Sequence, residues 1–229
     1  MENLDFSIVL PVHNEARNLS DVLHGLKKVL QEAGINPEII AVDNGSTDDT
    51  PDILKSLKRE IAELKTLRIE EVGAGIGIII GLEAAQAPIL GFMDADGQVR
   101  PEDTVKVFLK LKNENLDLCK GTRVGRFFGW ERKIVSKVYN FLFRAMFRLP
   151  FQDINGSPKI FTRRFYKEAK LVSKDWFLDA EIMIKAKRGG YRVGEVPIIY
   201  LARQGGGSNV SLLTIFEFLK NMLYWFLFK

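Results

Sequence analysis

The chain has 229 residues, of which 46% are hydrophobic and 27% are charged. This composition excludes a disordered or fibrous chain and is sufficient for a substantial core in one or two domains. The single cysteine, Cys119, excludes an internal disulfide and is typical of a reducing compartment.

The two halves of the chain differ strongly in charge. Residues 1–119 hold 12 Lys and Arg against 21 Asp and Glu, a net charge of −9, whereas residues 120–229 hold 21 against 8, a net charge of +13. We therefore expect the second half to face an anionic partner, which would be a phosphate, a membrane surface or a nucleic acid. The change near Lys120 is the candidate boundary, and it divides either one fold or two.

Apolar runs and amphipathic segments alternate through the first 120 residues. This alternation is typical of a parallel, doubly wound sheet with right-handed crossovers. The predicted strands are Phe6–Leu10, Glu38–Val42, Thr66–Val72, Ile89–Met93 and Leu116–Lys120. The predicted helices run from Asn18 or Ser20 to Glu32, from Asp48 with Pro51 in the first turn, from a glycine-rich loop to Ala87, and from Pro101 to Lys112.

Polar side chains follow three of these strands, at Asn14-Glu15, Asp43-Asn44 and Asp94–Gln98. In this topology the carboxyl ends of the strands meet at one edge of the sheet, where ligands of open α/β folds bind. Asp94 and Asp96 are one residue apart, and two carboxylates so close favour a nearby cation. Their hard oxygen ligands indicate Mg²⁺ or Mn²⁺. The alternative is a solvated Asp-x-Asp turn.

Two further features at this edge each allow two interpretations. Asp43 could accept hydrogen bonds from a base or a ribose, or it could be a capping or turn residue. A group of glycines follows the third strand, but Ile78 occupies the third position of a dinucleotide fingerprint. Close approach to a ligand and tight helix–sheet packing explain these glycines equally well. They are Gly73, Gly75, Gly77 and Gly81.

In the basic half, a helix with two different faces is predicted over Lys133–Leu149. Such a helix suits the headgroup layer of a membrane or the surface of the sheet. Its aromatic residues are separate from its basic residues, which argues against nucleic-acid binding. The basic side consists of Lys133, Lys137, Asn140, Arg144 and Arg148. The apolar side consists of Ile134, Val138, Phe141, Leu142, Met146 and Leu149.

The rest of the chain is predicted to contain short elements and one apolar helix. The helix Leu212–Phe228 is too short, with two internal charges, for a transmembrane span, and it suits an interfacial anchor or a docking helix. The short elements are a turn from Asp153 into a strand near Lys159, a helix from Asp179 to Gly189, a strand over Arg192–Val196 and a flexible segment over Arg203–Ser208.

Several motifs, taken in order along nearly the whole chain, carry a resemblance to a known family. They are Leu10–Glu15, Val42–Asp48, Gly75-x-Gly77, Asp94-x-Asp96-Gly-Gln98, Gly121-Thr-Arg123, Arg132, Asp153, Asp179-x-Glu181 and Arg203 to Ser208. The chain resembles the GT-A-fold, family 2 glycosyltransferases, and most closely the polyprenyl-phosphate (dolichol-phosphate) mannose or glucose synthases.

The resemblance implies a fold and a division of the chain. The fold is a GT-A, Rossmann-like, mostly parallel central sheet with helices on both faces, plus amphipathic helices near 130–149 and 212–228. The catalytic domain would span 1–210, with a nucleotide-sugar half over 1–119 and an acceptor half over 120–210. An interfacial or partner-docking helix would follow over 211–229.

The resemblance also implies roles for particular residues. The nucleotide sugar would be bound by Pro11, His13, Glu15, Asp43, Gly75, Gly77, Asp94, Ala95, Asp96, Arg203 and Ser208. The metal, Mg²⁺ or Mn²⁺, would be held by Asp96 and Gln98. The catalytic residues would be Asp94, Asp96, Arg123, Arg132, Asp153 and Asp179. The chain departs from the family at His13, at Asn44 and in the turn after Asp153.

The implied activity is the inverting transfer of mannose or glucose from GDP-mannose or UDP-glucose to a polyprenyl (dolichyl) phosphate. The chain would be peripheral, at the cytoplasmic face of a membrane surface, with a small membrane subunit as a candidate partner and no nucleic acid. A phosphate acceptor is largely dianionic and needs no general base, whereas a hydroxyl acceptor would need Asp153 or Asp179. The alternatives are therefore a hydroxyl-acceptor enzyme of the same family and a non-catalytic nucleotide- or lipid-binding module.

Overall fold

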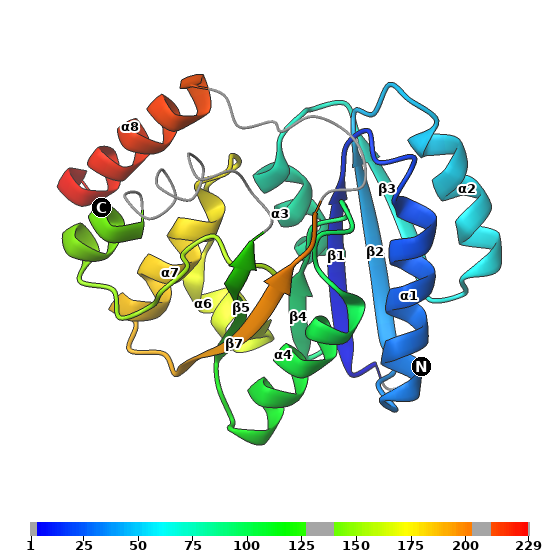
Figure 1. Cartoon of the computed structure of the whole chain (residues 1–229), viewed down its shortest axis with the longest axis horizontal. Helices are drawn as coiled ribbons and strands as arrows, with labels where there is room; N and C mark the ends of the chain where they lie inside the picture. Colours follow the sequence, from blue (N-terminus) through cyan, green and yellow to red (C-terminus); the bar gives the residue numbers. More distant parts are fainter. Residues whose placement is uncertain (1–3, 127–139, 203–211, 229) are drawn as a thin grey trace.

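The computed structural model describes residues 4–126, 140–202 and 212–228. A seven-stranded sheet with the order β3-β2-β1-β4-β6-β5-β7 runs through the centre of this structure (Figure 1). In chain order the strands are β1 Phe6–Val12, β2 Pro37–Asn44, β3 Leu64–Ile69, β4 Ile89–Phe92, β5 Leu118–Arg126, β6 Lys159–Thr162 and β7 Val193–Tyr200.

Helices cover both faces of the sheet, which confirms the predicted layering. One face packs against α1 Leu19–Glu32, α2 Thr50–Glu60 and α4 Pro101–Asn113. The other packs against α3 Ala74–Ala84, α6 Arg163–Ala169 and α7 Leu178–Arg188, with the helical residues 140–147 and α8 Leu212–Phe228 beside α7 (Figure 1). Because both faces are covered, the central strands are continuous apolar runs rather than alternating ones.

The direction of the strands explains where the polar side chains gather. β1, β2, β3 and β4 are mutually parallel, and β5 is parallel to β7. β6 is antiparallel to both β4 and β5, so all other strands end at the edge where β6 begins. We call this edge, at the ends of β1, β2, β4, β5 and β7 and the start of β6, the carboxyl edge.

Several element boundaries differ from the prediction. The predicted glycine-rich loop is wrong, because Gly75, Gly77 and Gly81 lie inside α3. β7 is longer than predicted, since it continues to Tyr200. The short helix α6 was not predicted at all; it begins after Thr162, whose hydroxyl accepts a hydrogen bond from the backbone N–H of Phe165.

The predicted two-faced helix is only partly confirmed. In its described part, Phe143 is fully buried, with its ring 6.0 Å from that of Phe177, whereas Phe141 is exposed. Asn140 does not lie on a solvated basic side, because its side-chain oxygen accepts a hydrogen bond from the backbone of Ile154 at 2.9 Å. Among the described helices, none is long and apolar enough to cross a lipid bilayer.

A buried carboxylate connects several elements at the edge of the sheet where β1 and β2 begin, opposite the carboxyl edge. Glu38 in β2 accepts hydrogen bonds from the Ser7 hydroxyl and the Gln86 backbone, and it pairs with Lys65. Burial by itself would raise the pKa of Glu38, but these three partners lower it below its ordinary value. A group with a lowered folded pKa stabilises the fold above its unfolded pKa, and this contribution disappears as the pH falls through the folded value.

Replacing Glu38 with glutamine is therefore expected to lower the free energy of unfolding by about 1–3 kcal/mol near pH 7. The difference from the unchanged protein should narrow as the pH falls below 4.5, the ordinary pKa of the group. Urea unfolding at a series of pH values measures this, with the exposed Glu32 replaced by glutamine as the control. A difference that is the same at every pH would contradict the assignment.

Candidate functional site

The loops after β1 and β2 are hydrogen-bonded to each other at the carboxyl edge. The side-chain oxygen of Asn14 accepts a hydrogen bond from the backbone of Thr47 at 2.8 Å, and the backbone N–H of Asn14 donates to the Ser46 hydroxyl at 3.0 Å. His13 Nδ1 lies 2.8 Å from the carbonyl oxygen of Asn44. These contacts hold the two loops in one arrangement, so that the polar ends of β1 and β2 form a single surface.

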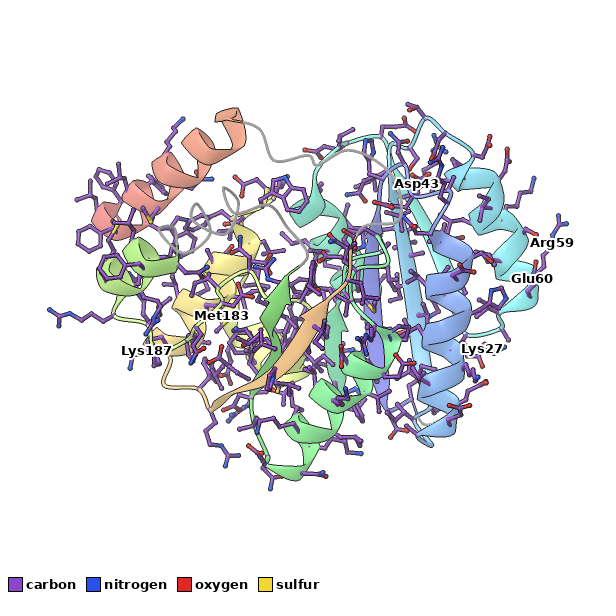
Figure 2. The ribbon with its side chains drawn as sticks, viewed as in Figure 1. Lys27, Asp43, Arg59, Glu60, Met183 and Lys187 are labelled. Carbon is purple, nitrogen blue, oxygen red and sulfur yellow. The ribbon has the colours of Figure 1, made fainter. Side chains whose placement is uncertain are left out.

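Asp43, at the end of β2, is a buried acidic residue of this surface (Figure 2). Its Oδ1 accepts a hydrogen bond from the Ser46 backbone at 3.0 Å, so the turn-forming interpretation is confirmed. Its Oδ2 lies 3.2 Å from Arg68 Nη1, but within the described residues this oxygen accepts no hydrogen bond. A buried acceptor of this kind is suited to an N–H or hydroxyl of a ligand, so the two interpretations of Asp43 are compatible.

Pro11 lies in β1, and Glu15 lies in the loop after β1 that contributes to this surface. Pro11, in β1, is partly buried and is paired in register with Val42 of β2. Glu15 is buried, and its carboxylate accepts a hydrogen bond from the Asn18 side chain at 2.8 Å. The backbone N–H of Glu15 donates to the Thr50 hydroxyl at 3.0 Å, which ties the loop to the first turn of α2.

The segment Asp94–Gln98 follows β4 directly and is fixed from both sides. Asp94 Oδ2 accepts a hydrogen bond from the Tyr200 hydroxyl at 2.5 Å. Asp96 Oδ1 accepts from the backbone N–H of Gln98 at 3.0 Å, which is the predicted turn. The Gln98 side-chain nitrogen donates to the carbonyl oxygen of Leu201 at 2.9 Å. Ala95 is buried between these contacts.

The donor set of this segment fits a divalent cation that is shared with a ligand. Gln98 makes its hydrogen bond with the amide nitrogen, the end of the side chain that does not bind metals. Asp94 and Asp96 supply carboxylate oxygens beside it, and Mg²⁺ or Mn²⁺ typically takes one or two carboxylates and completes its shell with substrate phosphate. In the described part of the chain, no three His, Cys, Asp or Glu side chains form a metal cage. A cation here would therefore depend on ligand oxygens.

A buried ion pair lies next to Asp94 on the side of β5. Arg123 binds Asp153 with two parallel hydrogen bonds, from Nε at 2.6 Å and from Nη2 at 2.7 Å. The guanidinium carbon of Arg123 also lies 5.3 Å from the centre of the Tyr200 ring. Burial opposes the charge on Arg123, but Asp153 outweighs it and raises the pKa of the guanidinium. Arg123 and Asp153 thus form a two-point ion pair in this site.

Two fully buried lysines, which sequence reasoning missed, complete the cluster. Lys159 at the start of β6 pairs with Asp179 and donates to the Gly156 carbonyl at 2.9 Å. Lys120 in β5 pairs with Glu195 at 2.7 Å. Burial lowers the pKa of Lys120, and burial raises the pKa of Asp179 despite the nearby Lys159. The available signal was a lysine directly after the apolar pair Leu118-Cys119 and another directly before the apolar pair Ile160-Phe161.

The predicted glycines meet protein atoms rather than open space. A Cβ at Gly75 would lie 2.4 Å from the carbonyl oxygen of Asp175, and one at Gly77 would lie 2.3 Å from the Asn44 side chain. Tight packing of α3 therefore accounts for Gly75 and Gly77. Their role in nucleotide binding stays a prediction. Arg132, Arg203 and Ser208, predicted to bind phosphate and donor, lie outside the described residues.

Comparison with known proteins decides the family. The sequence model described as glycosyl transferase family 2 matches residues 7–171, which is well over half of the chain. The chain belongs to glycosyltransferase family 2. Among its relatives, glycosyltransferase AglD of Haloferax volcanii is 26% identical over 92% of this chain and 35% of its own length. The dodecaprenyl-phosphate galacturonate synthase of Rhizobium johnstonii is 27% identical over 97% of this chain and 67% of its own.

A solved structure confirms the GT-A fold of this family 2 glycosyltransferase. The glucosyl-3-phosphoglycerate synthase of Mycobacterium tuberculosis, in complex with Mn²⁺, UDP and phosphoglyceric acid, superposes with a TM-score of 0.75. The superposition covers 97% of this chain and 78% of that one, at 19% sequence identity. The chain spans about a third of the length of AglD and about two thirds of the length of the Rhizobium synthase.

Proposed function

We propose that this family 2 glycosyltransferase transfers a hexose, mannose or glucose, from a nucleotide sugar to a polyprenyl phosphate with inversion. The observation that carries the proposal is the state of the two carboxylates that could activate a hydroxyl acceptor. Asp153 is held by Arg123 in a two-point ion pair, and Asp179 is held by the buried Lys159. These carboxylate oxygens already accept hydrogen bonds from cations and are not available to take a proton from an acceptor hydroxyl, so an acceptor that is already ionised is favoured.

The donor side of the proposal rests on the surface between β1, β2 and β4. Asp43 would accept a hydrogen bond from the base or the ribose with its buried Oδ2, next to Pro11 and Glu15. Asp96 and Gln98 would hold Mg²⁺ or Mn²⁺, which would supply positive charge to the departing nucleoside diphosphate. The donor site would also be lined by Asp94, His13, Ala95, Gly75, Gly77, Arg203 and Ser208.

The acceptor side would be built from the second half of the chain. The proposed nucleotide-sugar half, 1–119, contributes the ends of β1, β2 and β4, and the proposed acceptor half, 120–210, contributes β5, the start of β6 and α7. Both meet at the carboxyl edge, where Asp153 orients Arg123 towards Tyr200. Arg123, together with Arg132, would hold the acceptor phosphate by charge-assisted hydrogen bonds. The name of the Rhizobium relative, a synthase of a dodecaprenyl phosphate-linked sugar, supports this choice of acceptor.

The test is product formation by the unchanged chain with a panel of nucleotide sugars that includes GDP-mannose and UDP-glucose. Each is incubated with Mn²⁺ or Mg²⁺ and either a short polyprenyl phosphate or the matching free polyprenol, and the lipid-linked sugar is measured. We expect transfer to the phosphate only. Transfer to the free alcohol at the same rate would reject a lipid-phosphate acceptor.

We further propose that the chain docks on a membrane surface through α8 and the helix 140–147. α8 is fixed to the domain by Trp225, whose ring lies 5.8 Å from that of Phe177, and by Asn221, which donates to Asp175 at 2.7 Å. The opposite side of α8 remains exposed and apolar, with Leu227 and Phe228 at its end. An apolar face flanked by cations suits an anionic headgroup layer. The flanking cations in the described residues are Arg144, Arg148 and Lys220.

Vesicle binding tests this membrane contact. Replacing Lys133, Lys137, Arg144 and Arg148 with glutamate should abolish the salt-sensitive part of binding, since each cation contributes on the order of 1 kcal/mol near an anionic surface. In the control, three cations of α2 are replaced with glutamate: Lys55, Lys58 and Arg59. Helix α2 lies at the end of the molecule opposite α8 (Figure 2). Co-sedimentation is measured with neutral and anionic vesicles at rising salt. Equal binding to both kinds of vesicle at every salt concentration would reject the electrostatic contribution.

A further inference from the structure

One contact at the carboxyl edge joins residues that no sequence motif connects. The Tyr200 hydroxyl, at the last position of β7, donates to Asp94 Oδ2, 106 residues earlier in the chain, at 2.5 Å. Tyr200 is 4% exposed, so its hydroxyl is withdrawn from solvent and directed at this carboxylate. Its ring packs in the hydrophobic cluster on the α4 side of the sheet, which fixes the position of the hydroxyl.

The residue after Tyr200 strengthens the same connection. The backbone N–H of Leu201 donates to the carbonyl oxygen of Gln98 at 2.9 Å, and the Gln98 side chain donates back to the carbonyl oxygen of Leu201 at 2.9 Å. The end of β7 is therefore attached at three points to the segment Asp94–Gln98. Because side chains in packed strands have little freedom, Asp94 receives its orientation from β7 rather than from its own loop.

Tyr200 also reaches the acceptor side of the site. The guanidinium of Arg123 lies against its ring at 5.3 Å, and Arg123 is held in turn by Asp153. A continuous series of contacts thus runs from Asp153 through Arg123 and Tyr200 to Asp94. The ring and the hydroxyl of Tyr200 make different contacts, so a substitution can remove the second and leave the first.

We propose that Tyr200 is a positioning residue that holds the Asp94 carboxylate in the orientation required to bind the nucleotide part of the donor. This inference rests on the proposed function for the location of the donor site, but not for the identity of the acceptor. A carboxylate already held by a buried hydroxyl loses little freedom when a ligand binds, so part of the cost of ordering the site is removed in advance. Without the hydroxyl, donor affinity should fall although every proposed donor-contacting residue is still present.

The experiment measures the affinity of the full chain for UDP and for GDP, each with Mn²⁺, by isothermal titration calorimetry without acceptor. Tyr200→Phe, which keeps the ring on Arg123, should weaken the binding of whichever nucleotide the chain prefers by about tenfold. The control is Tyr191→Phe, which removes another tyrosine hydroxyl that donates to a carboxylate, that of Glu168. Tyr191→Phe should leave the affinity unchanged. Thermal unfolding checks that each variant is folded.

A double-mutant cycle separates positioning from a general structural effect. If Tyr200 acts through Asp94, Tyr200→Phe should have little further effect on affinity once Asp94→Asn is present. An equal tenfold loss in both backgrounds, unchanged affinity in Tyr200→Phe, or tighter binding would overturn the inference. Failure of the unchanged chain to bind either nucleotide would overturn the donor site and this inference together. If the cycle gives the expected affinities but the unchanged chain forms no lipid-linked sugar in the transfer assay, only the proposed acceptor is overturned.

Discussion

Replacing Asp96 with asparagine is expected to abolish sugar transfer, with a loss of about 3–5 kcal/mol of transition-state stabilisation. The substitution keeps the shape of the side chain and an oxygen that can still accept the hydrogen bond from the Gln98 backbone. It removes the negative charge with which Asp96 would hold a divalent cation. The loop should therefore remain folded while the site loses its affinity for the metal.

The measurement is the rate of formation of lipid-linked sugar, with and without excess EDTA, followed by addition of Mn²⁺ or Mg²⁺. We expect EDTA to stop the unchanged protein reversibly and Asp96→Asn to remain inactive after metal is added back. Asp52→Asn, in the exposed first turn of α2, is a matched control that should retain full activity. Full activity of the unchanged protein in excess EDTA would be incompatible with a metal-dependent donor site.

The second large effect is expected at Arg123, where the proposed lipid phosphate would be bound. Arg123→Ala should cost roughly 2–4 kcal/mol of transition-state binding, because a charge-assisted contact in a partly dry site is lost. Arg123→Lys keeps the charge but not the two-point pair with Asp153, so an intermediate loss is expected. Arg132→Ala is expected to cost as much transition-state binding as Arg123→Ala. Arg164→Ala, which breaks another arginine–carboxylate pair, with Asp117, should leave transfer unchanged.

The carboxylates provide the contrasting half of this prediction. With a phosphate acceptor, Asp179→Asn should leave a transfer rate that does not depend on the ionisation of any carboxylate near position 179. With a hydroxyl acceptor the order would be reversed, and Asp153→Asn or Asp179→Asn would be the most damaging change. Because burial raises the pKa of Asp179, a base at this position would also make the rate rise with pH above the ordinary carboxylate range. Rates of Arg123, Asp153 and Asp179 variants across pH distinguish the two cases.

Much of the donor surface could be predicted from the sequence because its signals are local. An apolar run that ends in polar residues marks the end of a buried strand, and strand ends in a parallel sheet meet at one edge. These signals predict that Glu15, Asp43 and Asp94 lie at the same edge, and the structure confirms that β1, β2 and β4 are neighbours with parallel directions. The alternation of strands and helices also predicted helices on both faces of the sheet, since parallel strands require crossovers.

The glycines of α3 show where local signals are insufficient. Their spacing predicted either a ligand or close packing, and a loop was expected around them. The structure shows the close packing, because the backbone of Asp175 and the side chain of Asn44 leave no room for a Cβ at Gly75 and Gly77, and a ligand role for these glycines stays a prediction. Those neighbours come from distant parts of the chain, so no window of sequence around the glycines contains the information.

The sequence by itself determined which residues end the strands of the first half and which charges the second half carries. Only the tertiary structure decided how those charges are partnered. The chain returns from β5 to β6 at the carboxyl edge, so β6 runs antiparallel and brings Lys159 against Asp179. In the same way the length of β7 brings Tyr200 to Asp94. Such pairs depend on where strands lie beside each other, and the free energy that places them comes from the burial of the whole core rather than from any local pattern.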